Sequence, residues 1–256
     1  MIELKDITVS FASVGQARPF VALDRLNLTI DDGEYVTLVG TNGAGKSTML
    51  NVLAGTVPLA EGRILVDGRD VTDTPDFRRA EWLARVFPDP RVGTCDQLTV
   101  EENMAVAVGK LGRRGLQPAN NAAQRKLFAE RLAELNLGLE SRLQTPVHLL
   151  SSGQRQSITV VMASLTQTRL LLLDEHVANL DPRTQKTVMD LSDRMIRSMG
   201  LAAVMVTHDV RHALEYGDRL IALKDGRVIL DVSGAEKQRL TPADVDAVYE
   251  DLKIPA

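Results

Sequence analysis

The most chemically distinctive stretch of the sequence is a glycine-rich segment that ends in lysine, serine and threonine. It reads Gly40-Thr41-Asn42-Gly43-Ala44-Gly45-Lys46-Ser47-Thr48. Glycines adopt positive φ and lack a Cβ atom, so consecutive N–H groups can turn inward around phosphate oxygens. Lys46 would add a positive charge for the β- and γ-phosphates, and the Ser47 hydroxyl would be a ligand for Mg²⁺. The segment therefore predicts a nucleotide-phosphate site.

The flanking residues supply the context that this motif needs. The apolar run 35–39 precedes the segment and indicates a strand, and residues 49–54 follow it with a helix-like pattern. A helix in that place points its positive end at the bound anion. The alternative is an ordinary glycine-rich turn with an exposed lysine. The complete motif between a strand and a helix favours the phosphate site.

Two acids follow a second apolar run. Leu170–Leu173 is continuously apolar, as in a buried parallel strand, and Asp174 and Glu175 come directly after it. Ligands of open α/β sheets bind outside the carboxyl ends of the strands, so these acids are expected to complete the site. Asp174 would hold Mg²⁺, directly or through water, and Glu175 would polarise the attacking water. The alternative is an acidic pair that only ends the strand.

Two further segments could reach a phosphate. His208 follows the apolar run 201–206, where an imidazole can approach a γ-phosphate, although a lone histidine is more often structural. Leu150-Ser151-Ser152-Gly153-Gln154 has the composition of a serine N-cap. The same residues at the start of a helix also form an anion site.

The composition limits the class of protein. The chain has 256 residues, of which 44% are hydrophobic and 25% charged, typical of a globular protein with one large domain or a domain and a subdomain. A net charge of −4 gives no argument for nucleic acid. Cys95 is the single cysteine, as fits a reducing compartment. The apolar runs of the sequence are far shorter than the ~20 residues that span a bilayer. Charged residues also interrupt the N-terminus. Any membrane role is therefore expected to come through a partner.

The elements expected from periodicity alternate between strands and helices. Strands are predicted over 1–9 and 26–30 with a loop over 10–24 between them, and a hairpin over 220–230. A short helix is predicted over 76–82, followed by a strand over 83–87. From Thr99 to about Leu149 the pattern is helical, and the helix expected over 121–137 places Leu127, Phe128, Leu132 and Leu135 on one face. The pattern predicts an α/β chain with a helical insertion.

Taken together, these motifs resemble the nucleotide-binding subunits of ATP-binding cassette (ABC) transporters over essentially the whole chain. Residues 150–154 resemble the LSGGQ signature with Ser152 in place of a glycine, and 170–175 the Walker B strand. The segment Ala178-Asn179-Leu180-Asp181 is similar to the D-loop and His208 to the switch histidine. Phe11 falls where the family stacks an aromatic ring on adenine. The alternatives there are a core phenylalanine at a strand end, or Phe20 as the stacking ring.

The resemblance implies a fold and a mechanism. The expected fold is an α/β P-loop NTPase with a RecA-like core, an N-terminal antiparallel β subdomain and a helical insertion subdomain. Residues 1–87 and 169–256 would form the core and 88–168 the signature subdomain. In the family, two ATP are sandwiched head to tail between two subunits, with Mg²⁺ as the metal. Ser151, Gly153 and Gln154 of one chain, with Asp181, would then lie at the ATP of the other.

The resemblance also implies partners and a location. A second nucleotide-binding subunit, in a homodimer, and an integral membrane permease are expected, with an indirect link to a solute-binding protein and no nucleic acid. The chain would be cytoplasmic and peripheral on the inner face of the membrane, with the helical block receiving the permease. Residues 101–104, His176 after Glu175, and residues 230–234 resemble a subgroup that serves importers of tryptophan, tyrosine or related solutes.

One position departs from the family. The family's Q-loop glutamine follows a strand in a segment like VFQDP, whereas this chain has Val86-Phe87-Pro88-Asp89-Pro90. Proline has no side-chain amide to reach Mg²⁺ or water, and it stiffens a hinge. We therefore expect ATP binding to survive and hydrolysis, or its coupling to the permease, to be impaired. Asp89 is one residue out of register for the glutamine's role.

The leading interpretation is an importer ATPase subunit, and three alternatives stay open. These are the ATPase of a separate-subunit exporter, a soluble ABC ATPase with no transport role, and a degenerate regulatory subunit in which Pro88 abolishes hydrolysis. Soluble members of the family usually carry tandem cassettes or long coiled-coil insertions, and this sequence has neither pattern.

Overall fold

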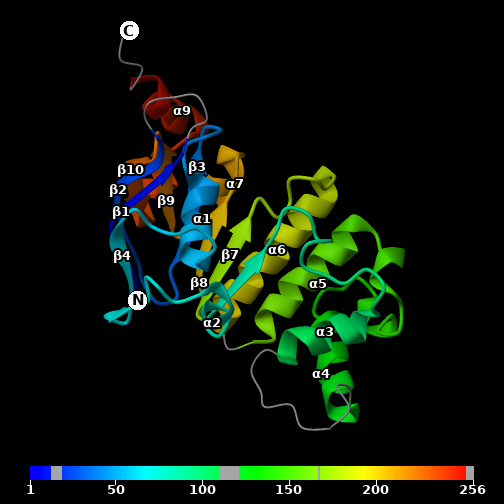
Figure 1. The fold of residues 1–256 in the computed structure, drawn as a ribbon. Helices are drawn as coiled ribbons and strands as arrows, with labels where there is room; N and C mark the ends of the chain where they lie inside the picture. Colours follow the sequence, from blue (N-terminus) through cyan, green and yellow to red (C-terminus); the bar gives the residue numbers. More distant parts are fainter. Residues whose placement is uncertain (13–18, 110–120, 167, 252–256) are drawn as a thin grey trace. The chain divides into compact units, whose positions relative to one another are not determined.

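The structure, a computed structural model, describes residues 1–12, 19–109, 121–166 and 168–251 (Figure 1). They form two compact units, Met1–Arg79 with Gly200–Ala256, and Ala80–Met199. The predicted division into a core over 1–87 and 169–256 and a signature subdomain over 88–168 stays a prediction.

An antiparallel sheet in the first unit contains β2 (Phe20–Ile30), β1 (Ile2–Phe11), β4 (Glu61–Val66) and β5 (Arg69–Asp70), in that order. The loop predicted over 10–24 is wrong at both of its ends. Ser10 pairs with Val21 and Phe11 with Phe20, so both strands run further than the pattern indicated. Bulges in β1 interrupt the alternation of buried and exposed residues, which hid the ends of the strands from a period-2 reading.

The strand that leads into the glycine-rich segment, β3 (Tyr35–Gly40), is parallel to β8 (Ala202–Val206) and to β9 (Arg219–Lys224). Residues 35–39 of β3 are buried, as a strand with neighbours on both sides requires. The predicted hairpin is confirmed, with β9 antiparallel to β10 (Arg227–Ser233). The core on one side of these strands includes Val39, Leu220 and Val245.

Helices of the first unit cover these strands. They are α1 (Lys46–Ala54), α2 (Asp76–Arg79), α7 (Val210–Glu215), α8 (Gly234–Arg239) and α9 (Pro242–Asp251). The helix predicted over 76–82 ends early, at Arg79, whose buried guanidinium donates to the carbonyls of Val52 and Leu53 at the end of α1. The chain turns there because these hydrogen bonds hold Arg79 against the end of α1.

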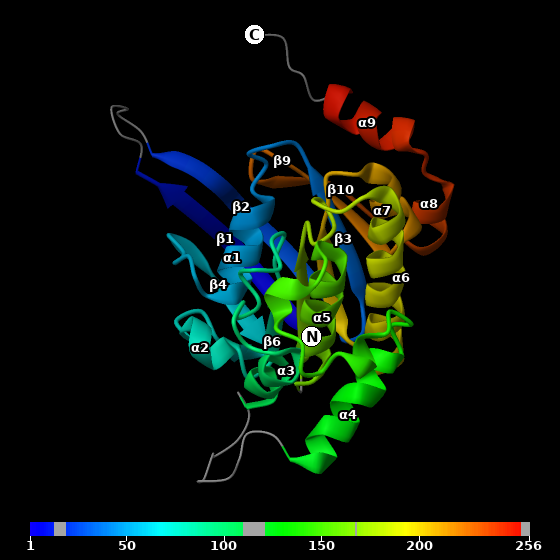
Figure 2. The ribbon, with the colours of Figure 1, turned by 90° about the vertical axis from the view of Figure 1, so that its right-hand side faces the viewer.

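The second unit pairs two parallel strands, β6 (Leu83–Val86) and β7 (Leu170–Asp174). Its helices are α3 (Val100–Val108), α4 (Ala122–Ala133), α5 (Ser152–Ser164) and α6 (Pro182–Met199), with short 3₁₀ turns η2 (Leu139–Ser141) and η3 (Val147–Leu149). Figures 1 and 2 both show α5 and α6 side by side.

Two details of the predicted helix over 121–137 are wrong. The helix α4 ends at Ala133, because Asn136 and Gly138 adopt positive φ of 54° and 68°, which no helix continues. Phe128 and Leu132 are buried, but Leu127 is 41% exposed. At ~3.6 residues per turn, 127 lies about 100° from 128 around the helix and so misses the buried face.

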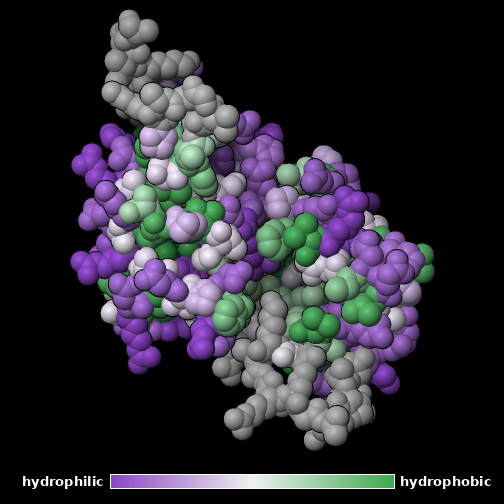
Figure 3. Space-filling model, viewed as in Figure 1, coloured by the Kyte–Doolittle hydropathy of each residue, from purple (hydrophilic) through white to green (hydrophobic). Residues whose placement is uncertain are grey.

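No helix within the described residues is long and apolar enough to cross a membrane. On the face drawn in Figure 3, hydrophobic residues gather in small groups among hydrophilic ones.

Candidate functional site

The glycine-rich segment is shaped by backbone conformations that only glycine adopts easily. Gly43 and Gly45 have φ of 81° and 102°. A Cβ atom on Gly45 would lie 2.5 Å from the carbonyl oxygen of Ala22 and 2.8 Å from Leu23 Cδ2. On Gly40 it would lie 2.6 Å from the carbonyl oxygen of Leu223. The loop therefore tolerates no side chain at either end, and it delivers the chain into α1 in a fixed direction.

The start of α1 is open to an anion. Gly45 is the N-cap residue and has no side chain to occupy the first-turn amides, so those donors point outward along the helix axis. Thr41, Asn42 and Ser47 are exposed around them. The geometry matches the predicted phosphate cradle of backbone N–H groups at a helix N-terminus.

Lys46 brings a positive charge to this loop. The residue is 6% exposed, and its Nζ donates to the carbonyl oxygens of Gly40 at 2.7 Å and Thr41 at 3.1 Å. These carbonyls solvate the buried ammonium, which would otherwise be costly to hold away from water.

His208 belongs to the same unit as this loop. Leu38 of β3 is in register with Val206 of β8, and Thr207 N donates to the carbonyl of Leu38. Gly40 and His208 each follow that register by two residues, so they lie level at the carboxyl ends of neighbouring parallel strands. His208 is exposed there, and Asp209 next to it caps α7.

Two phenylalanines stand together at the far end of the antiparallel sheet. Phe11 and Phe20 are directly paired across β1 and β2, and they are 41% and 55% exposed. Directly opposed residues of an antiparallel pair share one face, so the two rings are neighbours. Stacking of Phe11 on adenine stays a prediction. Phe20, the alternative stacking ring, lies next to Phe11.

In the second unit, the acids of β7 are held by side chains. Asp174 Oδ2 pairs with Arg85 Nη2 of β6 at 2.6 Å, and the two side chains are 10% and 13% exposed. Glu175 follows in a left-handed conformation with φ of 44°. His176 comes next, is 1% exposed, and lies 3.1 Å through Nε2 from the Oγ of Ser192 on α6.

The 150–154 segment starts α5 as predicted. Ser151 is the exposed N-cap residue of a capping box in which its Oγ accepts from Gln154 N and Gln154 Oε1 accepts from Ser151 N. Gly153 packs closely on α6, because a Cβ atom there would overlap Cγ2 of Thr184 and would require that side chain to move. Ser152, which replaces the family's usual glycine, is exposed.

Residues of the D-loop segment adjoin this start. Asp181 is exposed and accepts from Thr184 N at 3.1 Å, and hydrogen bonds from Thr184 lower the pKa of Asp181. A cavity of about 500 Å³ joins the signature and D-loop segments to the residues after β6. It is lined by Asp89, Pro90, Arg91, Leu150, Ser152, Arg155 and Asn179. Both arginines of the lining already have a carboxylate partner: Arg91 pairs with Asp89 at 2.8 Å and Arg155 with Asp96 at 2.7 Å.

Pro88 lies two residues after the end of β6 at Val86. The carbonyl of the preceding Phe87 accepts from Gln156 Nε2 of α5 at 3.1 Å, so α5 holds this segment through its backbone. The carboxylate of Asp89 is taken by Arg91, whose hydrogen bonds lower the pKa of Asp89. Asp89 thus has an ion-pair partner in its own loop, and whether it substitutes for the missing glutamine stays a prediction.

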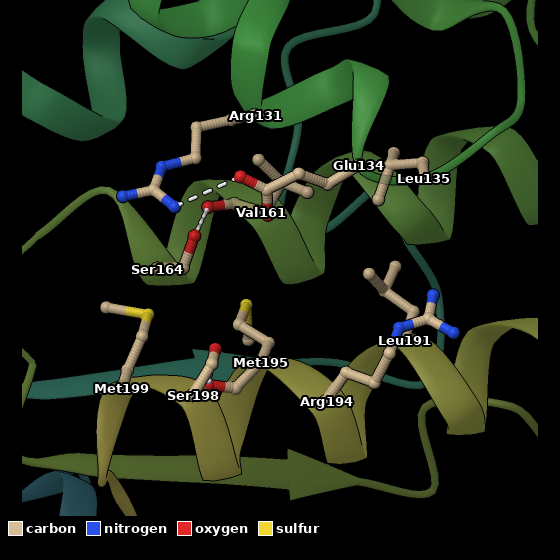
Figure 4. Close-up of a pocket in the computed structure, with 10 residues that line it drawn as sticks. All are labelled: Arg131, Glu134, Leu135, Val161, Ser164, Leu191, Arg194, Met195, Ser198 and Met199. Carbon is tan, nitrogen blue, oxygen red and sulfur yellow. Dashed lines mark hydrogen bonds and ion pairs between the residues drawn. The ribbon is translucent and has the colours of Figure 1, made fainter.

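A second groove in this unit lies between α4, α5 and α6 (Figure 4). It encloses about 370 Å³, and its lining includes Arg131, Glu134, Ser164 and Met199. Arg131 pairs with Glu134 at 3.3 Å. The groove is at the C-terminal end of α5, about 18 Å along the helix from Ser152 at ~1.5 Å per residue, so it is no part of the signature segment.

The structure therefore groups the predicted residues in two sets. The P-loop, Phe11 and His208 belong to the first unit, and Asp174, Glu175, the signature segment, Asp181 and Pro88 to the second. Three residues that the sequence analysis did not single out are Arg85, Gln156 and Ser192. Of these, only Arg85 could have been noticed in the sequence, because it is a charged residue in the otherwise apolar strand β6.

Comparison with known proteins identifies the family of the chain. A family model described as ABC transporter matches residues 23–178. A tyrosine transport ATP-binding protein of Clostridioides difficile (strain R20291) is 39% identical over 251 residues, covering 98% of this chain and 99% of the relative. The spermidine/putrescine import ATP-binding protein PotA of Escherichia coli (strain K12) is 34% identical, covering 82% of this chain but only 52% of its own length.

Solved structures agree in fold. The dimeric ATP-binding cassette MJ0796 in a post-hydrolysis state, bound to ADP and Pi, superposes with a TM-score of 0.76 at 29% identity, covering 91% of this chain and 98% of that one. The ADP conformation of the cassette MJ1267 gives 0.79 at 23% identity, covering 98% of each chain, and shows the fold alone. The predicted P-loop α/β fold with an antiparallel sheet is confirmed.

Proposed function

The chain belongs to the ABC transporter family and is an ATP-binding subunit with ATPase activity, and from that premise we propose how its residues divide the work. Two copies bind two ATP molecules head to tail. Hydrolysis then drives uptake of a small, amino-acid-like solute through a separate membrane subunit, on whose inner face the pair sits.

The observation that carries the proposal is the geometry of residues 40–48. Gly45 is held in a conformation and a space that admit no side chain, and Lys46 points its ammonium at the loop's own carbonyls. A triphosphate in this loop would receive the backbone N–H groups, the helix N-terminus and the lysine charge together. Phe11 would stack on the adenine.

The residues present fit Mg²⁺ by their donor chemistry. The exposed Ser47 hydroxyl and the Asp174 carboxylate are hard oxygen donors, which Mg²⁺ prefers. Bound there, the ion would neutralise charge on the β- and γ-phosphates. Asp174 now faces the guanidinium of Arg85, so metal binding at Asp174 would exchange one positive partner for another.

Hydrolysis needs a residue that polarises water and a group that contacts the γ-phosphate. Glu175, partly buried after β7, fits the first role, and His208, exposed after β8, the second. Ser151 and Gly153 would contact the γ-phosphate held by the partner copy, with Gln154 and Asp181 beside it. The exposed start of α5 at Ser151 supports that role.

The test of the paired arrangement uses Glu175→Gln, which keeps the shape of the side chain and removes its charge. We expect this variant to form a stable dimer with ATP in gel filtration, since ATP binds but is not hydrolysed. Glu175→Gln combined with Lys46→Ala is the control and should remain monomeric. A persistent monomer of the single variant at saturating ATP would contradict a homodimeric site.

The membrane subunit is proposed to dock on an apolar groove of the second unit. The groove encloses about 230 Å³, and its lining includes Phe87, Val92, Val106 and Met162. Val92 and Val106 are 64% and 49% exposed, a large exposure for valine, and a short amphipathic helix would cover them. Val106→Glu should abolish copurification with the membrane subunit, whereas Leu127→Glu, an exposed position outside this groove, should not.

Pro88 is proposed to weaken hydrolysis or its coupling to transport while ATP binding is retained. Pro88→Gln should raise ATP turnover or solute uptake per ATP and leave the ATP dissociation constant unchanged. Unchanged ATPase and transport in this variant would contradict the proposal. Near-zero ATPase of the natural complex, restored by the substitution, would instead favour a regulatory subunit.

An amino-acid-like solute is favoured because the relative that matches over its whole length serves tyrosine transport. The PotA relatives, named for spermidine/putrescine import, match over about half of their own length. Polyamines are therefore the second candidate solute. Uptake of labelled tyrosine and spermidine into vesicles holding the reconstituted complex separates the two. Copurification with an integral membrane protein separates both from a soluble ABC ATPase, and the direction of flux separates import from export.

A further inference from the structure

Glu175 has a backbone conformation that needs an explanation. Its φ of 44° is in the left-handed region, which costs energy for any residue other than glycine. Other non-glycine residues with positive φ include Asp67 and Asp225, both next to a glycine at the turn of a hairpin. Glu175 instead follows a fully buried strand. Surrounding contacts must hold it there.

Contacts on both sides of Glu175 are strong. Before it, Asp174 is fixed to Arg85 by the 2.6 Å ion pair. After it, His176 is 1% exposed and bonds through Nε2 to Ser192 Oγ, which is itself fully buried in the middle of α6. The carbonyl of Glu175 also accepts from Ala178 N at 3.0 Å, which closes the turn. The residues on either side of Glu175 are therefore held by side chains of β6 and α6.

The direction of the histidine bond follows from the serine. Ser192 has one hydroxyl hydrogen, and its Oγ donates to the carbonyl of Val188 at 2.8 Å. With that hydrogen on the Val188 carbonyl, the Oγ accepts from His176, and we assign the tautomer with the hydrogen on Nε2. A buried imidazole N–H without an acceptor would be costly, so the serine fixes the ring in one orientation.

We propose that His176 is a positioning residue for Glu175: its Nε2–H bond to Ser192 anchors the left-handed turn to α6 and so aims the Glu175 carboxylate at the water it polarises. The inference rests on the proposed role of Glu175. The imidazole itself contacts no substrate and moves no proton. Weakening the anchor should let the turn relax and displace the carboxylate, and a displacement of ~1 Å can cost ~100-fold in rate.

The test compares variants of both ends of the bond in the full-length chain. Ser192→Ala removes the acceptor and keeps a good helix former, and His176→Leu keeps apolar volume without a donor. We expect each to lower kcat by about 10- to 100-fold. The ATP dissociation constant, measured with a fluorescent ATP analogue, should change less than about twofold, because the P-loop is untouched. Ser198→Ala, on the same helix, is the matched control and should leave kcat unchanged.

A second pair of variants separates positioning from packing. The amide nitrogen of glutamine reaches the place of His176 Nε2, whereas that of asparagine falls short of it. His176→Gln should therefore restore most of kcat and His176→Asn should not. The double variant His176→Leu with Ser192→Ala should be no slower than the slower single variant, since both remove one bond.

The outcomes decide between two roles. If kcat stays within twofold of the natural chain in Ser192→Ala and His176→Leu, the proposal is overturned. It is also overturned if glutamine and asparagine behave alike, or if ATP affinity falls in parallel with kcat. The kcat of Glu175→Gln is measured in the same series. If its kcat is undiminished, Glu175 does not have the proposed role, and this inference fails with it. Repeating the series in a Pro88→Gln background covers slow turnover of the natural chain.

Discussion

The P-loop after β3 and the acidic turn after β7 both follow a buried parallel strand, but they are held in place by different means. The P-loop takes its shape from glycines at positive φ and from its own carbonyls around Lys46. The acidic turn places a glutamate at positive φ and fixes its neighbours by side chains. Arg85 is 89 positions from Asp174, and Ser192 is 16 positions from His176.

The conformation of a glycine-rich loop depends mainly on its own residues, whereas the direction of an acidic side chain depends on distant ones. The positive φ angles of the loop come from its own glycines, although Leu223, Ala22 and Leu23 lie close to its two ends. A carboxylate on a strand end takes its direction from whatever packs against it. Measurements of unfolding free energy test this difference.

The largest effect is expected at Arg85. Arg85→Met leaves the buried carboxylate of Asp174 without its ion-pair partner and should lower the free energy of unfolding by about 3–5 kcal/mol in urea titration. Arg85→Lys should recover part of the loss. The double variant Arg85→Met with Asp174→Asn should be more stable than Arg85→Met, because no buried charge is stranded. A loss below about 1 kcal/mol would mean that the acidic turn does not depend on β6.

A smaller loss is expected in the P-loop. Gly45→Ala combines a left-handed conformation with overlap against Ala22 and Leu23, and should lower the unfolding free energy by about 2–4 kcal/mol. Gly43 is the matched control, since its φ is 81° but nothing lies within 4 Å of an added Cβ. Gly43→Ala should cost only about 1–2 kcal/mol. Equal losses would show that overlap does not matter there.

The two helix starts give a third, smaller contrast. Gly45 leaves the first turn of α1 uncapped by a side chain, whereas Ser151 caps α5. Ser151→Ala should lower the unfolding free energy by about 1 kcal/mol, and Ser151→Gly by only a few tenths. Chemical denaturation without nucleotide checks both values. An unaffected Ser151→Ala would indicate that the serine is placed for a ligand and contributes nothing to its helix.

The smallest effect concerns pH. Hydrogen bonds from Thr184 lower the pKa of Asp181 below its ordinary 3.8, so its contribution is present above pH 3.8 and is lost as the pH falls through the lowered value. The unfolding free energy of Asp181→Asn should therefore depend less on pH in that acidic window than that of the natural chain. Parallel denaturation curves across the window check this. Identical pH dependence would contradict a role of the charge.

Several elements were predictable because their signals are local. The β3 strand, the P-loop, α3, α5 and the β9–β10 hairpin follow from apolar runs, caps and turn residues that are adjacent in sequence. The paired ends of β1 and β2 were not, because a register across strands, interrupted by bulges, decides them. Leu127 was misplaced because apolar character alone does not say which side of α4 meets the core.

The family and the shape of the glycine-rich loop were readable from the sequence, since glycines, a lysine and carboxylates at fixed spacing have a characteristic chemistry. Only the tertiary structure decided that Asp174 faces Arg85, that Glu175 sits in a left-handed turn, and that His176 is tied to Ser192. The physical reason is that backbone preference is a property of neighbouring residues, whereas the direction of a buried side chain is set by the distant groups that satisfy its charge and hydrogen bonds.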